Sequence, residues 1–362
     1  MLDCMKRRHF LGTLAGLPAG LRAQTAVIGP RALVFPADFG AHPDARSEWW
    51  YLTGTLQAGE RLFGFQITFF RSRNEVAAGH TSRFAARQLV FAHAALSDVQ
   101  AGRLRHDQRI ARAGFGIAEA AEGDTRVVLR DWSLQREGTL EASRYRALVA
   151  SDDAGFRFDL TFTTTQPLLL QGEAGLSRKG PKPAQASHYY SQPQLAAAGT
   201  LTLDGRALPV RGRAWLDHEW SEALLDPQAV GWDWIGMNLD DGSALTAFRL
   251  RRADGSTLYA GGSLRRPGGT VRSFRPDEVR FTPAGRSWLS PASQARYPVQ
   301  WMLETPAGRH RVNALLDAQE LDSRGSTGAF YWEGLSELQD ERGRRVGHGY
   351  LEMTGYAARL VL

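Results

Sequence analysis

The residues best suited to chemistry lie between Gly212 and Gly242. This segment, GRAWLDHEWSEALLDPQAVGWDWIGMNLDDG, is unusually rich in Trp and carboxylates and contains one His. Large aromatic faces beside titratable groups suit a cavity that binds an apolar molecule and then protonates or polarises it. The residues concerned are Asp217, His218, Glu219, Glu222, Asp226, Trp215, Trp220, Trp232 and Trp234.

The run Asp217-His218-Glu219-Trp220 is the sharpest catalytic candidate. On a β-strand, Asp217 and Glu219 face one side, and His218 and Trp220 face the other. His218 could shuttle a proton, or a carboxylate could orient it so that one ring nitrogen meets the substrate. The competing interpretation is a His held in a polar network at the end of a strand.

In the run Trp232-Asp233-Trp234, strand geometry again decides which side chains can face a cavity. If both Trp side chains face a cavity, they can stabilise a developing cation, and Asp233 points away from it. The opposite facing places Asp233 in the cavity as an acid. Period-two geometry makes these arrangements exclusive unless a bulge intervenes. Packing of both Trp in a plain core is the third possibility.

A second aromatic cluster, Glu48 to Tyr51, includes Trp50 and could be the N-terminal counterpart of the first. His42, Asp44 and Glu48 have the residue types of metal ligands at short spacing, but Pro43 makes a common facing uncertain. We therefore predict neither a metal nor a cofactor, and assign Glu48, Trp50 and Tyr51 to substrate binding.

Two further aromatic positions are candidate binding residues. Tyr189, in the run His188-Tyr189-Tyr190, could cap a groove between domains, or it could be interface packing. Tyr350 shares one strand face with His348 and Glu352, which allows a cavity role or simple hairpin packing.

The elements that must position these residues are predicted to be strands. Apolar residues alternate through residues 49–56 and 63–70, across a turn at Ala58-Gly59-Glu60, and similar short alternating runs recur along the chain. This pattern predicts an all-β fold of antiparallel barrels or sandwiches. The polar, Gly- and Pro-rich stretch 171–187 predicts a linker, which gives domains 24–186 and 187–362.

Internal similarity supports a tandem arrangement. The segment beginning at Glu48 resembles the one beginning at Trp232: each has an aromatic pair, a strand, a short turn and a second strand. The runs LSDVQAGR at Leu96 and LSELQDERGR at Leu335 form a second, weaker echo. Two matches in the same order favour a duplicated β-unit, with chance similarity between hairpins as the alternative.

Composition restricts the class of protein. The 362 residues are 43% hydrophobic and 23% charged, with a net charge of +6 carried mostly by scattered Arg. No basic helix or RNA-binding signature accompanies this charge, so nucleic acid is not an expected partner. No apolar run could span a bilayer in the mature chain. Sequence patterns for nucleophile elbows, zinc proteases, Walker loops and dinucleotide binding are also absent.

The N-terminus predicts export. Arg7 and Arg8 precede Phe10, Leu11 and a weakly apolar stretch, which resembles a twin-arginine signal over residues 1–23. We therefore expect a periplasmic or secreted protein. The single cysteine, Cys4, lies inside this segment, so the mature fold would be stabilised by packed cores without disulfides.

Eight ordered motifs between His42 and Tyr356 resemble one family. They are HPDARSEWWYLTGTL, FGFQITFFR, HAALSD, YYSQPQLAAAGTL, GRAWLDHEWS, GWDWIGMNLDDG, YWEG and GHGYLEMTGY. The sequence is similar to the lipocalin-like carotenoid 1,2-hydratase and AttH-type "secreted hydrolase" family, and is closer to the AttH-type branch. This resemblance implies two consecutive lipocalin-like β-barrel domains.

The resemblance also implies roles for two residues. In the carotenoid hydratase branch, a His and a Trp two positions later are implicated in catalysis, and His218 and Trp220 match them. That branch also has a downstream Tyr-x-Asp pair, whereas this chain has Trp232, Asp233 and Trp234.

These observations lead to a main hypothesis with two alternatives. The main hypothesis is an exported, cofactor-independent enzyme that protonates or hydrates an apolar, unsaturated substrate. Asp217, Glu219 or Asp233 would supply the proton with help from His218, and Trp220, Trp232 and Trp234 would stabilise the cation. The alternatives are a non-catalytic carrier of lipids or apolar ligands, with an envelope transporter as possible partner, and a hydrolase.

Overall fold

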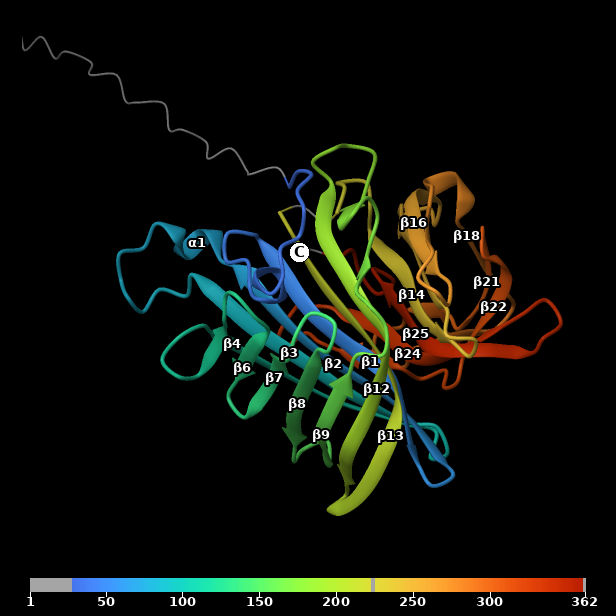
Figure 1. Ribbon diagram of the computed structural model, residues 1–362, viewed down its shortest axis with the longest axis horizontal. Helices are drawn as coiled ribbons and strands as arrows, with labels where there is room; N and C mark the ends of the chain where they lie inside the picture. The colour runs from blue at the N-terminus through green and yellow to red at the C-terminus, as the bar shows by residue number, and fades with distance from the viewer. Residues whose placement is uncertain (1–27, 223–224, 361–362) are drawn as a thin grey trace, which may run out of the picture.

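The computed structural model describes residues 28–222 and 225–360 (Figure 1). The predicted signal over residues 1–23, including Cys4, Arg7 and Arg8, lies outside these residues. Within the described ranges, helix is confined to α1 (Glu75–Ala78) and the 3-10 turns η1 (Ala37–Phe39) and η2 (Pro276–Glu278). No helix in these ranges is long and apolar enough to cross a membrane. The prediction of an all-β fold is confirmed.

A 13-stranded antiparallel sheet forms the first part of the described chain, and it curls toward a barrel, because β3 and β4 at one end contact β5 and β6 at the other. Its strand order is β4-β3-β2-β1-β13-β12-β9-β8-β7-β6-β5, with β10 and β11 paired to β12. The strands are β1 (Ser47–Ala58), β2 (Arg61–Arg73), β3 (Gln88–Asp98), β4 (Arg103–Arg112), β5 (Ala118–Ala120), β6 (Arg126–Leu129), β7 (Trp132–Glu137), β8 (Arg144–Ser151), β9 (Phe156–Thr163), β10 (Leu169–Leu170), β11 (Leu176–Arg178), β12 (Ala186–Leu203) and β13 (Arg206–Ser221).

A 10-stranded antiparallel sheet forms the second half, beside the first (Figure 1). Its order is β17-β16-β15-β14-β25-β24-β22-β21-β18, with β23 paired to β24, and β19 and β20 form a separate hairpin. The strands are β14 (Gly231–Leu239), β15 (Ala244–Arg251), β16 (Thr257–Arg265), β17 (Val271–Phe274), β18 (Arg280–Pro283), β19 (Ser287–Leu289), β20 (Arg296–Pro298), β21 (Gln300–Thr305), β22 (Gly308–Ala314), β23 (Glu320–Asp322), β24 (Phe330–Gln339) and β25 (Arg345–Thr354).

The two predicted hairpins occupy equivalent central places. β1 pairs with β2 and β13, and β14 pairs with β15 and β25. Each hairpin turns at a glycine with positive φ, Gly59 (59°) and Gly242 (86°), a conformation that costs other residues free energy. The second, weaker sequence echo does not link equivalent strands. β3 pairs with β2, which is the hairpin partner of β1. β24 pairs with β25, which lies on the side of β14 opposite its hairpin partner β15.

The division of the chain into sheets differs from the predicted division at 186/187. β12 and β13 pair with each other and with β9 and β1, so the first sheet continues to Ser221. The stretch 171–187, expected as a linker, instead folds back along β12 through β11. The strand that carries His218 is therefore part of the first sheet.

The first sheet has a filled interior. Apolar residues that alternate along β1 and β2, including Trp50, Leu52, Phe65 and Ile67, are fully buried there. The lead-in to β1 closes one region of it: Phe39 is fully buried, and its carbonyl accepts hydrogen bonds from Trp50 Nε1 (3.2 Å) and Thr125 Oγ1 (2.9 Å). A separate apolar cluster packs the two sheets together, and it includes Tyr51, Trp215, Trp234, Phe248, Leu335 and Tyr350.

Candidate active site

β13 has two chemically different faces. Its alternating backbone places Asp217 and Glu219 toward the second sheet, whereas His218 and Trp220 face the interior of the first. The alternation matches the prediction from the sequence. The carboxylates and the His therefore belong to different environments.

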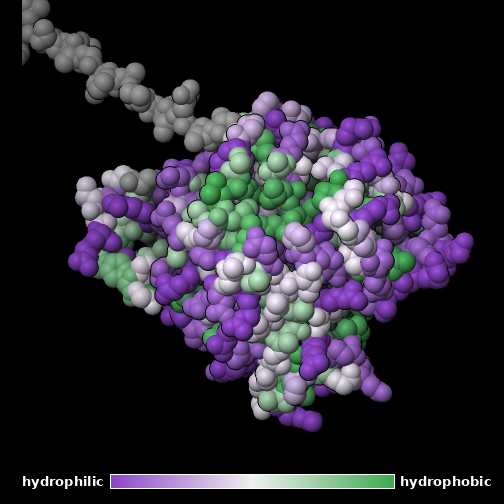
Figure 2. Space-filling view, in the orientation of Figure 1, coloured by the Kyte–Doolittle hydropathy of each residue, from purple (hydrophilic) through white to green (hydrophobic). Residues whose placement is uncertain are grey.

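A cavity of about 340 Å³ lies between the two sheets. Aromatic and aliphatic side chains dominate its walls, as is usual for sites that bind small molecules. Figure 2 shows apolar surface gathered near the place that Figure 1 marks with the letter C. Leu360, close to the C-terminus, lines the cavity. The apolar walls include Phe70, Leu89, Phe91, Ile110, Trp232, Trp234, Phe248 and Leu250.

Asp217 is the best placed acid in this cavity. One carboxylate oxygen accepts hydrogen bonds from Ser191 Oγ (2.5 Å) and Trp215 Nε1 (2.7 Å), and the other accepts one from the Tyr189 hydroxyl (2.8 Å). Burial outweighs these three donors and raises the pKa of Asp217 to about 7. Asp217 can therefore carry and release a proton near neutral pH.

Glu219 differs from Asp217 because a cation faces it. Lys179 Nζ lies 2.9 Å from Glu219 Oε1, and the Ser187 hydroxyl donates to the same oxygen. Lys179 also lies over the rings of Tyr189 (4.7 Å) and Phe248 (4.6 Å). Glu219 and Lys179 thus form a compensated ion pair in the cavity wall, beside the uncompensated Asp217.

The second sheet adds two more carboxyl groups to the cavity. Glu333 on β24 and Glu352 on β25 are direct partners in the strand register. Burial raises the pKa of both, and each also lies near other carboxylates, which disfavour a further negative charge. Glu333 and the Tyr51 hydroxyl are buried and interact with each other, and neither Glu333 Oε1 nor the Tyr51 hydroxyl has a further hydrogen-bond partner among the described residues. Acids from both sheets therefore converge on one apolar space.

His218 lies outside this cavity, on the other face of β13. It is fully buried and stacks on Trp50, with ring centroids 4.6 Å apart. Its Nε2 lies 2.9 Å from Glu48 Oε1, and its Nδ1 lies 3.0 Å from the Tyr190 hydroxyl. Burial lowers the pKa of His218, so this ring is neutral at pH 7.

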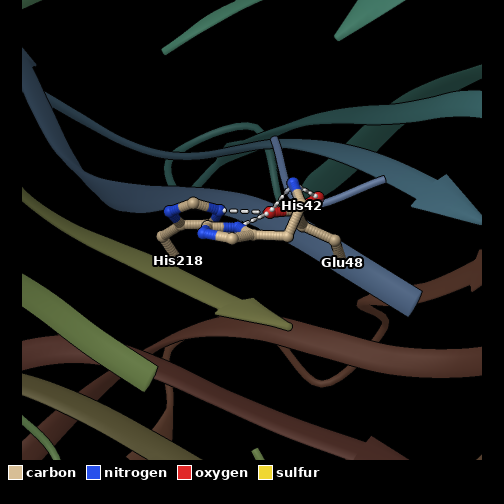
Figure 3. Close-up of side chains that lie close together, drawn as sticks. All are labelled: His42, Glu48 and His218. Carbon is tan, nitrogen blue, oxygen red and sulfur yellow. Dashed lines mark hydrogen bonds and ion pairs between the residues drawn. The ribbon is translucent and has the colours of Figure 1, made fainter. Parts of the chain in front are cut away.

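His42, Glu48 and His218 form the centre of a charged network (Figure 3). His42 Nδ1 lies 2.7 Å from Glu48 Oε1, and His42 Nε2 lies 2.8 Å from Asp38 Oδ1. Burial opposes a charge on His42, but these two carboxylates outweigh it and raise the pKa of the ring. Arg71 Nε lies 2.8 Å from the other Glu48 oxygen, and Arg31 pairs with Asp38.

The electrostatics of Glu48 are opposite to those of Asp217. Burial alone would raise the pKa of Glu48, but hydrogen bonds from His218 and His42 hold it well below its usual range. Cations and donors therefore keep Glu48 ionised, and the alternating charges Arg31, Asp38, His42, Glu48 and Arg71 compensate one another. Glu48 also contributes to the lining of the cavity, although its carboxylate is held by His42, His218 and Arg71.

The same three residues have the spacing of a metal site. One ligand atom each from His42, Glu48 and His218 lie within 4.8 Å of one another. In the hydrogen-bonded arrangement, both imidazoles present an N–H to Glu48 Oε1, and a metal would have to displace both protons beside the Arg71 guanidinium. The residues here fit a hydrogen-bonded ionic network better than a cation site. Asp44, the third ligand type noted in the sequence, is exposed and outside the cluster.

Several sequence-based assignments require correction. Asp233 faces away from the cavity and pairs with Arg249 (2.7 Å) and Arg251 (3.2 Å), so it cannot protonate a ligand there. The side chains of His218 and Trp220 face the first interior, and Trp220 stacks on His42 at 3.7 Å. The remaining exceptions are Trp50, which lies in the first core, and Tyr350, which packs between the sheets outside the cavity.

The other assigned residues do reach the cavity. Asp217, Glu219, Trp232, Trp234, Glu48, Tyr51 and Tyr189 all contribute to its lining. Because Trp232 and Trp234 face the cavity and Asp233 does not, the first of the two exclusive arrangements applies. Glu333, Lys179, His93 and Tyr331 were missed as site residues, although the alternation in YWEG could have paired Glu333 with Tyr331 on one strand face.

His93 and Ser326 resemble a nucleophile and its base, but their hydrogen bonds indicate another role. His93 Nε2 lies 2.8 Å from Ser326 Oγ, which donates to Gln108 Oε1 (2.6 Å), and His93 Nδ1 lies 2.8 Å from the Tyr331 hydroxyl. The backbone N–H groups of residues 326–328 all donate to the Ser323 carbonyl. These three N–H groups are therefore not free to act as oxyanion donors, and the hydrogen bonds of His93 and Ser326 link the two halves of the protein.

Comparisons with known proteins agree with this architecture. The sequence matches the AttH-like family over residues 26–356. The crystal structure of an AttH from Nitrosomonas europaea is 49% identical in sequence, covers 91% of this chain and 99% of that protein, and has a TM-score of 0.83. Kievitone hydratase from Nectria haematococca shares the fold, with a TM-score of 0.68 at 15% identity over 92% of this chain and 95% of that protein.

A curated relative gives a weaker match in sequence. Kievitone hydratase from Fusarium solani subsp. phaseoli is 23% identical over 177 residues, which span 47% of this chain and 49% of that protein. The alignment thus covers about half of the curated relative. The family match, in contrast, extends over nearly all of the described residues, and the protein belongs to the AttH-like family.

Proposed function

We propose that this protein is a hydratase-type enzyme that adds water across a carbon–carbon double bond of a largely apolar substrate. The observation that carries the proposal is Asp217: a carboxyl group with a pKa raised to about 7, in an apolar cavity walled by Trp232 and Trp234. A general acid is most effective when its pKa lies near the working pH. The resemblance of half the chain to a kievitone hydratase supports the same reaction class.

The proposed reaction uses groups that already line the cavity. The alkene takes the proton of Asp217, which forms a C–H bond and leaves a carbocation at the more substituted carbon. The indole faces of Trp232 and Trp234 stabilise that cation, each by up to about 2 kcal/mol when water is excluded. Water then forms the C–O bond, and its surplus proton returns to the Asp217 carboxylate.

The remaining polar groups would orient the substrate and the water. Glu219 is neutralised by Lys179 at 2.9 Å, so this pair can bind a polar end of the substrate without adding net charge. The Tyr51 hydroxyl and Glu333, which interact with each other, add a second polar pair to the same cavity. An amphipathic alkene that carries a hydroxyl or carbonyl group fits this distribution better than a pure hydrocarbon.

The test is a hydration assay in ¹⁸O-labelled water. Purified protein is incubated with a panel of prenylated phenols and isoprenoid alcohols, and products are analysed by mass spectrometry. We expect a product that has gained one labelled water, and we expect Asp217→Asn to abolish it. Asp152→Asn is the matched control, because the Asp152 side chain is 99% exposed.

Tight binding without conversion of any panel member would contradict the proposal and support an apolar-ligand carrier. Equal conversion by wild type and Asp217→Asn would show that another group supplies the proton.

We also propose that the protein is exported. Fractionation of cells that produce the full chain, with and without Arg7→Lys and Arg8→Lys, would test this.

A further inference from the structure

A second cavity, of about 390 Å³, lies farther along the same strands. Its lining comes from residues 53–57 of β1, residues 211–213 and 215 of β13, Leu62 of β2, and the facing ends of β14 and β25. The rings of Trp215 and Trp234 meet edge to face at 6.4 Å, with Trp234 lining the first cavity and Trp215 the second. The two cavities therefore have lining residues that contact each other.

The second cavity is positively charged. Arg211, Arg213 and Arg345 line it, with Asp240 as their acidic neighbour. Asp240 meets Arg213 and Arg345 only at 3.8 and 3.5 Å, and Arg211 makes no ion pair within the described residues. With three arginines and one carboxylate, the lining of the cavity has a net charge of +2.

The inner end of the cavity holds an unused hydrogen-bonding group. Thr53 Oγ1 is buried and has no hydrogen-bond partner among the described residues, and Thr53 is 1% exposed. A buried hydroxyl without a partner costs free energy, so a ligand atom that accepts a hydrogen bond from Thr53 Oγ1 would recover that cost. His348 also lines the cavity, and burial together with the nearby Arg345 lowers its pKa, so that it stays neutral and can share a ring N–H.

The size of the cavity exceeds that of a simple ion. A water molecule accounts for about 30 Å³ of liquid volume, so 390 Å³ accommodates an anion with an organic body. Leu56, Leu62 and Trp215 supply apolar surface for such a body. Guanidinium groups bind phosphate oxygens in pairs, and a dianion matches the net charge of +2.

We propose that this second cavity binds a phosphate monoester, with Arg211, Arg213 and Arg345 around the phosphate and the Thr53 hydroxyl at its inner end. The phosphate belongs either to a free organic phosphate or to the head group of a lipid, since both present the same dianion. The site is separate from the proposed hydration site and does not depend on that function.

The first experiment uses isothermal titration calorimetry of the full chain with inorganic phosphate and with glycerol 3-phosphate. We expect both to bind, the ester more tightly because it also occupies the apolar part. The double variant Arg211→Gln/Arg345→Gln should weaken binding at least tenfold. Arg280→Gln, an exposed arginine on β18, is the control and should bind as wild type does.

A second variant tests the inner end of the site. Thr53→Val keeps the shape of the side chain and removes a hydroxyl that has no partner, so its thermal unfolding should match or exceed that of wild type. We expect it to weaken phosphate binding several-fold. Asp217→Asn should leave phosphate binding unchanged, which separates this inference from the proposed hydration.

The third arm identifies the source of the phosphate. Flotation with phosphatidylcholine vesicles, with and without phosphatidic acid, should show binding that requires both phosphatidic acid and the arginines if the ligand is a lipid. Binding of the soluble ester alone would identify a free metabolite. Absence of binding in both arms, or binding that the double variant retains in full, would overturn the proposal.

Discussion

The two faces of β13 show how one strand can support both a buried ionic network and a carboxyl group that lines a cavity. On one face, His218 joins Glu48, His42 and Arg71 in a network whose charges alternate. On the other, Asp217 and Glu219 border a cavity of about 340 Å³. Asp217 and His218, adjacent in sequence, therefore lie in different chemical environments.

Compensation, more than burial, distinguishes the two faces. Glu48 and Asp217 are both almost inaccessible, at 1% and 3% exposure. Glu48 faces Arg71 and His42 and stays ionised, whereas neutral donors surround Asp217 and leave its pKa near 7. A buried carboxyl becomes a proton donor only where the protein omits a cation beside it.

The sharpest test of this difference compares Asp217→Asn with His218→Gln. We expect Asp217→Asn to lower the rate of hydration by about 10²–10⁴-fold, because it removes the general acid while keeping the shape of the side chain. His218→Gln should alter stability and leave more than half of the rate. The measurement is initial rate at saturating substrate for both variants, with circular dichroism to confirm folding. A larger loss of rate in His218→Gln would reverse the assignment of the two faces.

The second prediction concerns the ionic network. Glu48→Gln should destabilise the fold by roughly 3–5 kcal/mol, because it leaves His42 and Arg71 without their shared carboxylate in a buried setting. Urea unfolding at pH 7 measures the change, and Glu60→Gln at the exposed β1–β2 turn is the control. A loss below about 1 kcal/mol would show that the network is dispensable for stability.

The third prediction uses the pH dependence of stability. Asp217 has a pKa of about 7 in the folded protein and a lower value, 3.8, as the reference for the unfolded chain. Between these values the folded state binds more protons, so the contribution of this group to stability is greatest at low pH and is lost as pH rises through 7. We expect a slope of up to about 1.4 kcal/mol per pH unit between pH 5 and 7.

Urea unfolding of wild type and Asp217→Asn across pH 5–8 isolates this contribution. The difference in free energy of unfolding should favour the variant increasingly with pH and then level off above pH 7. A difference that stays constant across the range would show that Asp217 titrates normally. Glu48 gives the opposite sign, because its lowered pKa contributes stability that is lost only on acidification.

The pattern of the sequence was sufficient to predict which side chains share a face. Alternation along Asp217 to Trp220 and along Trp232 to Trp234 is a local property of a strand, so it could be deduced from these seven residues. The all-β fold and the equivalence of the β1–β2 and β14–β15 hairpins follow from the same periodicity.

Which face opens onto a cavity could not be deduced locally. That outcome depends on the lead-in, where Phe39 fills the first interior, and on the second sheet, which contributes Glu333 and Glu352 from far along the chain. Lys179 was hidden in a stretch that looked like a linker. Even Asp233, flanked by two cavity residues, was assignable only once Arg249 and Arg251 were located opposite it.

The smallest predicted effect compares two indoles, one from each environment. Trp234→Leu should reduce the rate of hydration by about tenfold, because a desolvated indole contributes roughly 1–2 kcal/mol to a nearby cation. Trp220→Leu should change the rate less than twofold, since Trp220 stacks on His42 away from the cavity. Trp234→Phe, which retains an aromatic face, should recover part of the loss. If Trp234→Leu and Trp234→Phe are equally impaired, the ring fills space and does not stabilise charge, and the cation would then have to rely on the carboxylates that face it.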